Sequence, residues 1–170
     1  YWPQLQQIMH WADEHVERTL YICWAAQAGL YEHYGINKYA LTDKMFGIFD
    51  QRVLCPDSFL MRGLTPSFKM PNSRHTAVSQ IDVEQAHDKG LQLIAASNES
   101  GVGVMATLDG RRTFIVGHLE YAADTLDKEY KRDLSKNLPI KAPLHYYNKE
   151  GQIAFSWQSD AAKFYRNWLE

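Results

Sequence analysis

The sequence predicts an α/β domain. Three observations lead to this fold class: a short apolar run that turns at once into an Ala-rich helical segment, three short strand candidates around an Asp-Gly pair, and amphipathic segments at both ends. The chain of 170 residues is long enough for one domain with a core of its own. We therefore interpret the sequence as one α/β unit.

The first elements follow from periodicity and from residues that stop helices. Pro3 suits the first turn of a helix, and helical spacing of apolar residues extends this helix over 3–18. Residues 20–23 are predicted to form a short buried strand. A second helix covers 24–34 and ends at Gly35. This order of strand, turn and helix is typical of α/β proteins.

The remaining elements are shorter. Residues 45–53 alternate imperfectly, as a strand does, and three prolines make 54–80 look irregular. Asp109-Gly110 predicts a type I′ hairpin. The further strands are expected at 91–96, 102–108 and 112–117, and the further helices at 82–89, 124–136 and 159–169. In the last helix Phe164, Trp168 and Leu169 share a face that we expect to be buried.

Composition excludes several classes of function. The formal net charge is −2, so no broad cationic field predicts binding to nucleic acid or to an anionic membrane. No apolar run approaches the ~18–20 residues of a membrane span, and no signal-peptide pattern is present. The two cysteines, Cys23 and Cys55, form no Cys-x-x-Cys pair, which suits a reducing compartment. We expect a cytoplasmic protein.

Cys23 is the first candidate for chemistry. It stands where the strand at 20–23 meets the following helix, so a tight turn would lift its thiol out of the sheet, near the positive end of the helix. The backbone N–H of Trp24 would then point at an oxyanion, as in the elbows that carry a nucleophilic serine. The alternative is a small, inert core cysteine.

His118 and Glu120 form the second candidate. His118 follows a predicted strand at the edge where ligands bind in open α/β sheets, and in extended chain Glu120 faces the same way. The carboxylate would orient the imidazole, which would act as a base on a nucleophile. His-x-Glu is common by chance, so a surface pair is the alternative. Together with Cys23, a Cys–His–Glu triad is the better hypothesis.

Three further residues are weaker candidates. Ser73 lies in a segment bounded by prolines and could donate to a substrate or simply form a turn. Lys44 could pair with an anionic group or be solvated, and Arg132 lies in a charged helix that could be an exposed face with i,i+4 pairs. The seven histidines form no tight ligand pattern, so no metal site is predicted.

With these residues in view, the chain resembles the homoserine O-acyltransferases of methionine biosynthesis, often called homoserine O-succinyltransferases. The resemblance covers nearly the whole chain. The matching segments are "YWPQLQQIMHWADEHVERTLYICWAAQAGLYEHYGINKY", "KMFGIF", "PNSRHT", "DGRRTFIVGHLEYAADTLDKEYKRDL" and "FYRNWL".

This resemblance implies a flavodoxin-like three-layer sandwich of the class I glutamine-amidotransferase type. It implies Cys23 as the acylated nucleophile, His118 as the base and Glu120 as its partner, with Trp24 in the oxyanion hole. Lys44, Ser73 and Arg132 fall on positions that contact substrate, and Arg132 suits the amino-acid carboxylate. The implied substrates are acyl-CoA and homoserine, with no other cofactor, and the implied assembly is a homodimer.

The sequence departs from the family pattern at the elbow and after the histidine. The family commonly reads Cys-Trp-Gly-Ala-Gln and Gly-His-Pro-Glu-Tyr-Asp, whereas this chain has Ala25, Leu119 and Ala122. These changes remove no catalytic group but leave serine open as the acceptor. Acetyl and succinyl donors, a glutamine-amidotransferase-like amidase and a non-catalytic fragment also remain open.

The chain begins at Tyr1 inside a predicted helix, whereas the family carries a substantial segment before it. We therefore expect residues 1–170 to be the C-terminal portion of a single acyltransferase domain. The preceding segment would supply the early strands and a second oxyanion donor.

Overall fold

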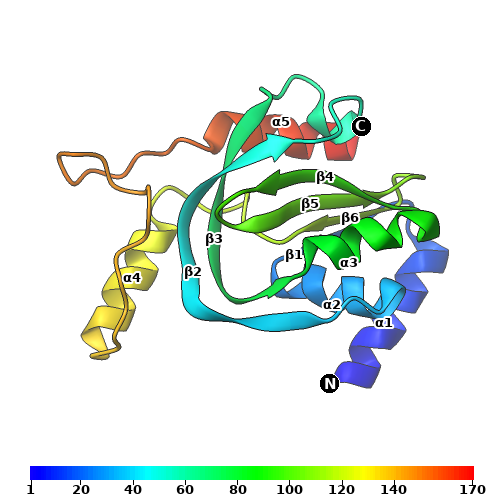
Figure 1. The fold of residues 1–170 in the computed structure, drawn as a ribbon, viewed down its shortest axis with the longest axis horizontal. Helices are drawn as coiled ribbons and strands as arrows, with labels where there is room; N and C mark the ends of the chain where they lie inside the picture. Colours follow the sequence, from blue (N-terminus) through cyan, green and yellow to red (C-terminus); the bar gives the residue numbers. More distant parts are fainter.

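The structure is a computed structural model that describes residues 1–170. Its centre is one six-stranded sheet in the order β1-β6-β5-β4-β2-β3 (Figure 1). Only β1 and β6 run parallel, and every other neighbouring pair is antiparallel. The strands are β1 (Thr19–Ile22), β2 (Lys38–Val53), β3 (Ser67–Val78), β4 (Leu91–Ser97), β5 (Gly101–Thr107) and β6 (Arg112–Ile115).

Helices cover both faces of the sheet and make three layers. The α-helices are α1 (Trp2–His15), α2 (Trp24–Tyr34), α3 (Gln80–Gln85), α4 (Thr125–Ser135) and α5 (Gln158–Leu169), with 3₁₀ turns at Phe59–Met61 and Ala86–Lys89. One core contains Met9 of α1, Leu30 of α2 and Val83 of α3. The other contains Trp157 and Phe164 from the α5 side. Figure 1 shows α4 at the side, beyond the bend of β2 and β3.

Most local predictions are confirmed within a few residues, because the residues that end each element act locally. Gly35 ends α2 in the left-handed conformation, with φ 72°. α1 stops at His15 rather than at residue 18. The Asp-Gly hairpin forms, but only Gly110 has a positive φ, and its N–H donates to the Thr107 carbonyl at 2.9 Å. The predicted type I′ turn, which needs two positive φ angles, is therefore wrong.

Two predictions about packing are wrong. Residues 54–80 are not irregular throughout, since they contain the twelve-residue strand β3. This strand lies at the edge of the sheet, where a strand tolerates the missing N–H of Pro71. In α5, Phe164 is fully buried as expected, whereas Leu169 is 77% exposed at the end of the helix.

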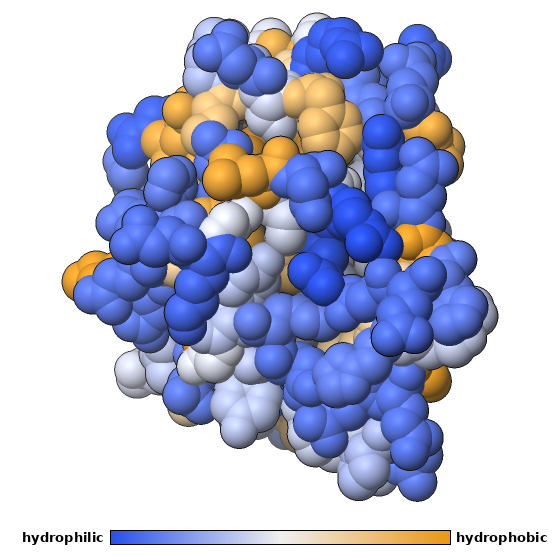
Figure 2. All heavy atoms as spheres, turned by 90° about the vertical axis from the view of Figure 1, so that its right-hand side faces the viewer, coloured by the Kyte–Doolittle hydropathy of each residue, from blue (hydrophilic) through white to orange (hydrophobic).

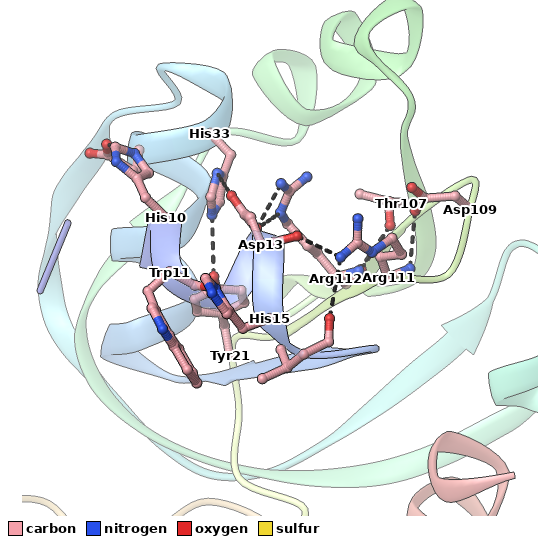
Figure 3. Close-up of polar contacts among 12 residues, drawn as sticks. His10, Trp11, Asp13, His15, Tyr21, His33, Thr107, Asp109, Arg111 and Arg112 are labelled. Atoms are coloured by element: carbon pink, nitrogen blue, oxygen red, sulfur yellow. Dashed lines mark hydrogen bonds and ion pairs between the residues drawn. The ribbon is translucent and has the colours of Figure 1, made fainter. Parts of the chain in front are cut away.

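A polar cluster fastens α1 to the amino ends of β1 and β6 (Figure 3). Arg112 pairs with Asp13 of α1, with its Nη2 2.7 Å and its Nε 2.8 Å from Oδ1. His33 at the end of α2 lies 3.8 Å from the same carboxylate, and its Nε2 is 3.2 Å from the Tyr21 hydroxyl. The Arg111 guanidinium donates to the Asp13 carbonyl at 2.6 Å. These bonds tie two helices to two strands.

Figure 2 views the molecule from the right-hand side of Figure 1. Hydrophilic residues cover most of this face, and apolar residues gather in smaller groups, the most visible of them near the top of the view. This end of the molecule therefore presents no continuous apolar surface. Elsewhere in the chain, no helix combines the length and the apolar character that a bilayer crossing requires.

Candidate active site

Cys23 occupies the turn between β1 and α2. It has φ 53° and ψ −112°, a conformation that residues with a side chain rarely adopt. The Cys23 N–H donates to the Ile115 carbonyl at 2.7 Å, and the Cys23 carbonyl accepts from Gln27 at 3.2 Å, which begins the helix. The thiol is partly exposed, unlike that of a core cysteine. The turn therefore presents the thiol at the carboxyl end of β1.

Small residues let α2 lie close to the sheet behind this turn. Ala26 is fully buried, and a Cβ on Gly29 would stand 2.9 Å from the ring of Phe114. The turn also closes with Ala25 in place of the glycine of the family pattern. The N–H of Trp24 is the first of the helix and has no acceptor four residues back, so it is free to face an oxyanion.

His118 follows β6 and is fixed by its backbone. Its N–H donates to the Pro71 carbonyl of β3 at 2.8 Å. This approach requires glycine at position 117, where a Cβ would stand 2.6 Å from the same oxygen. The imidazole stacks on the ring of Tyr121, with centroids 4.1 Å apart. The chain thus places His118 beside the Cys23 turn, since both follow neighbouring parallel strands.

Glu120 faces His118, with Oε1 2.6 Å from Nδ1. This contact leaves Nε2 for the thiol of Cys23. Burial by itself lowers the pKa of His118, but hydrogen bonds to and negative charge at Cys23 and Glu120 outweigh it and raise the pKa to about 9. At neutral pH the geometry therefore favours an imidazolium between two acidic groups.

The structure also gathers Lys44, Ser73 and Arg132 around one carboxylate that the sequence analysis missed. Lys44 Nζ is 2.6 Å from Oε1 of Glu129, and Ser73 donates to the same oxygen at 2.8 Å. Arg132 Nη2 is 3.8 Å from it and 2.7 Å from Asp133. Glu129 lies one turn before Arg132 on α4, a spacing visible in the sequence but unremarkable in a charged helix.

The other face of α4 fits the alternative interpretation of this helix. Lys128 pairs with Asp124, and Lys131 pairs with Asp127, both at 2.7 Å and at i,i+4 spacing. Both lysines are exposed, whereas Glu129 and Asp133 face the bend of β2 and β3 through Lys44. The i,i+4 pairs of the alternative interpretation are therefore present on this helix.

Two tyrosines have pKa values that respond to the charges of these groups. Burial first, and then negative charge at Glu129, Cys23 and Glu120, raises the pKa of Tyr121, so its phenol lies within electrostatic range of both clusters. The Tyr165 hydroxyl of α5 is buried without a hydrogen-bond partner of close geometry. Burial and the nearby carboxylate of Glu120 raise its pKa. Charges from both clusters therefore act on Tyr121, which stacks on His118.

No group of three or more histidine, cysteine, aspartate or glutamate side chains has a spacing that could hold a metal ion. A strained thiol, an imidazole, a carboxylate and a free N–H are the parts of a covalent acyl-transfer site.

Comparison with solved structures identifies the fold. A glutamine amidotransferase from Thermotoga maritima superposes with a TM-score of 0.71 at 15% identity, covering 99% of this chain and 67% of the other. A glutamine amido transferase from Methylobacillus flagellatus gives 0.68 at 13% identity, covering 98% and 68%. At these identities the likeness concerns the fold alone. It confirms the predicted α/β fold of the class I glutamine-amidotransferase type.

Comparison with sequences identifies the family. The homoserine O-succinyltransferase family model matches residues 1–170. Homoserine O-acetyltransferases from Lachnoclostridium phytofermentans and Bacteroides fragilis are 46% and 47% identical over 99% of this chain. One from Petrotoga mobilis is 43% identical. The chain spans about 56% of the length of the first two relatives. The resemblance seen in the sequence is therefore confirmed, and the chain belongs to the homoserine O-succinyltransferase family.

Proposed function

We propose that the protein transfers an acyl group from acyl-CoA to the hydroxyl of homoserine through an acyl-cysteine intermediate, in methionine biosynthesis. One observation carries the proposal: Cys23 stands in a strained turn beside an imidazole that Glu120 holds at 2.6 Å. Membership of the family supports the reaction class. The proposed catalytic residues are Cys23, His118 and Glu120, and Trp24 supplies an oxyanion donor.

The first half-reaction forms the acyl-enzyme. Glu120 orients His118, so that Nε2 takes the proton of the Cys23 thiol as the sulfur attacks. The Cys23 sulfur attacks the thioester carbon, and the Trp24 N–H stabilises the oxyanion, an interaction typically worth ~10²–10³ in rate. The tetrahedral intermediate collapses with loss of the CoA thiolate, which takes the proton of His118. The sulfur is now a neutral thioester.

The second half-reaction needs His118 as a base, and the acylation itself provides it. Once the sulfur carries the acyl group, the negative charge at Cys23 that helped to raise the pKa of His118 is gone. The neutral imidazole then takes the proton of the acceptor hydroxyl, and the oxygen attacks the acyl carbon. O-acylhomoserine leaves, and the proton returns from the imidazolium to the sulfur. Each half-reaction moves one proton through Nε2.

The Glu129 cluster suits an amino-acid acceptor. The Arg132 side chain is more than half exposed, so its fork can bind a carboxylate beside Asp133. The Glu129 carboxylate, held by Lys44 and Ser73, can accept from an ammonium group. Opposite charges spaced in this way match the two charged groups of an α-amino acid. Lys44, Ser73 and Arg132 are therefore the proposed substrate-binding residues.

The names of the relatives favour acetyl-CoA as the donor, since they are homoserine O-acetyltransferases, while the family name favours succinyl-CoA. We propose acetyl-CoA first. Product analysis with both donors and with homoserine and serine tests this choice. Formation of O-succinylhomoserine alone would reverse it.

Acylation of Cys23 is tested by mass spectrometry after incubation with acetyl-CoA and no acceptor. We expect one acetyl group on the peptide that contains Cys23 and none in Cys23→Ala. The matched control is Cys55→Ala, because Cys55 is the other cysteine and its thiol donates to the Leu93 carbonyl at 3.2 Å instead of facing a base. An adduct that persists in Cys23→Ala would contradict the assignment.

An amidase of the glutamine-amidotransferase type is the competing reaction of the same triad. Release of ammonia from glutamine at a rate comparable with acyl transfer would favour it. We propose in addition a cytoplasmic homodimer that uses no cofactor besides its acyl-CoA substrate. Light scattering of the purified protein tests the dimer.

A further inference from the structure

Tyr121 lies face to face with the imidazole of His118. The two ring centroids are 4.1 Å apart, and the ring planes differ by only 13°. At the edge of the same imidazole, Nδ1 lies 2.6 Å from Oε1 of Glu120. His118 is therefore held in two independent ways, by a carboxylate at one ring atom and by an aromatic ring across one face. The reaction proposed above gives Tyr121 no role.

The two contacts restrict different motions of the imidazole. The hydrogen bond to Glu120 fixes the position of Nδ1, but the ring can still tilt about this single contact. An aromatic ring stacked on one face opposes the tilt, because stacked rings keep close to parallel. The direction of Nε2 therefore depends on both contacts. Nε2 is the atom that moves the proton in the proposed reaction, and proton transfer requires its alignment with the reacting groups.

The backbone of Tyr121 is anchored to the interior of the protein. Its N–H donates to the His118 carbonyl at 3.3 Å, which closes a turn between the two stacked residues. Its carbonyl accepts a hydrogen bond from Nε1 of Trp157 at 3.0 Å, and Trp157 is fully buried. The Tyr121 side chain packs against the same core cluster that contains Trp157. The ring that covers His118 is thus supported by the core beneath α5.

A second stacked histidine shows what is particular to this arrangement. Trp11 stacks on His15 of α1, with centroids 4.7 Å apart and planes 5° apart (Figure 3). Both residues are exposed, and Nδ1 of His15 donates to the Trp11 carbonyl at 2.8 Å instead of meeting a carboxylate. Stacking alone therefore marks no site. At His118 the stack is combined with a carboxylate and with a place beside the Cys23 turn.

We propose that Tyr121 is a positioning residue, whose ring fixes the plane of the His118 imidazole so that Nε2 points to the reacting atoms. The inference rests on the role proposed for His118 in acyl transfer. Tyr121 acts through the imidazole, and its flat ring, rather than its hydroxyl, is the part that is required. Phenylalanine should therefore replace tyrosine at this position, whereas an aliphatic residue should not.

Steady-state kinetics of two variants in the full chain, with acetyl-CoA and homoserine, test the requirement for a ring. In Tyr121→Leu we expect kcat to fall about 10- to 100-fold, because a misplacement of about 1 Å can cost about 100-fold. KM for both substrates should stay within about twofold, since substrate binding does not need the imidazole plane. Tyr121→Phe is the matched control and should keep kcat within about threefold. Wild-type kcat in a folded Tyr121→Leu protein, or equal losses in both variants, overturns the proposal.

The support from Trp157 provides a second pair of variants. Trp157→Phe removes the donor to the Tyr121 carbonyl, and it should lower kcat about threefold with KM unchanged, as loss of one hydrogen bond suggests. Trp168→Phe is the matched control on the same helix, because the Nε1 of Trp168 is buried without a hydrogen-bond partner. It should leave kcat unchanged. Equal kcat in the two variants contradicts the anchoring of Tyr121 by Trp157.

A measurement without substrate separates the positioning of His118 from the reaction. In protein with ¹³C-labelled histidine, NMR relaxation of the His118 ring signal, assigned by its absence in His118→Gln, reports the motion of the imidazole. We expect an order parameter near about 0.85 in the wild type and in Tyr121→Phe, and below about 0.6 in Tyr121→Leu. A rigid imidazole in Tyr121→Leu overturns the proposal. Absence of acyl transfer in the wild-type protein would contradict the proposed function and leave this test intact.

Discussion

Two partly buried histidines face carboxylates at opposite ends of β1 and β6, and their pKa values shift in opposite directions. His118 lies 2.6 Å from Glu120, and its pKa is raised to about 9, since Cys23 and Glu120 outweigh burial. His33 lies 3.8 Å from Asp13, and its pKa is lowered, first by burial and then by the charge of Arg112 (Figure 3). The surroundings of His118 therefore favour its protonated form, and those of His33 favour its neutral form.

A third residue beside each histidine and its carboxylate explains why the two pKa values shift in opposite directions. Arg112 takes up the carboxylate of Asp13 at 2.7 Å and leaves little of its charge for His33. Glu120 has no arginine or lysine partner, so its charge acts on His118, and the thiol of Cys23 adds to it. A histidine beside a carboxylate is therefore insufficient to identify a catalytic pair. It also matters whether another cation, such as Arg112 beside Asp13, pairs with the carboxylate.

The largest predicted difference concerns loss of the imidazoles. His118→Gln is expected to lower the rate of acyl transfer about 10⁴-fold, because proton transfer to and from substrate is lost. His33→Gln is expected to stay within about twofold. Steady-state kinetics with acetyl-CoA and homoserine measure both. Comparable losses of acyl-transfer rate in folded His118→Gln and His33→Gln would contradict the different roles assigned to the two histidines.

Substitution of Glu120 should affect mainly activity, whereas substitution of Asp13 should affect mainly stability. Glu120→Gln is expected to lower kcat by about 10²–10³, because the imidazolium loses its partner, and to leave the melting temperature nearly unchanged since Glu120 is partly exposed. Asp13→Asn should keep the activity. It should cost about 1–2 kcal/mol, because Arg112 loses its partner at a site about one-quarter exposed. Urea unfolding and kinetics on both variants measure the two effects, and a reversed pattern would contradict the assignment.

The sequence predicts the triad because each of its parts is a local pattern. Cys23 lies at a seam between a strand and a helix, and His118 and Glu120 lie two residues apart. Glu129 and Arg74 form hydrogen bonds with residues far along the chain: Lys44 is 85 residues from Glu129, and Ser100 is 26 from Arg74. Nothing local marks such contacts, so only the fold could reveal them.

The strand β3 was missed for a related physical reason. Its polar residues and Pro71 do not alternate with apolar ones as in a half-buried strand. In the structure Thr76 donates to Gln27 of α2, the helix that follows Cys23, and Ser73 donates to Glu129 of α4. Polar residues of the candidate site therefore point to both faces of this edge strand, where alternating apolar residues would otherwise predict a strand.

The two histidines also predict opposite slopes of stability with pH. The lowered pKa means that His33 resists protonation in the folded state. Its contribution to the free energy of unfolding is therefore present above pH ~6.5 and is lost as the pH falls below that value. A raised pKa means that the contribution of His118 is present below ~6.5 and is lost as pH rises through about 9. One proton changes stability by at most ~1.4 kcal/mol per pH unit. Urea unfolding from pH 5 to 7 should therefore show a shallower slope in His33→Gln, and an unchanged slope would contradict the neutral state of His33.

The smallest effect is expected in α2, the helix that joins the two ends. Ala25→Gly restores the residue of the family pattern next to the Cys23 turn, which already closes with alanine. Glycine loses more conformational entropy on folding than alanine does, so the variant should lose about 0.5–1 kcal/mol of stability. Acyl transfer should change by less than about threefold, because the mutation alters neither the sulfur nor its charged neighbours. A larger change in rate at unchanged stability would show that the turn geometry at Cys23, in addition to the charges around it, distinguishes the reactive end from the structural one.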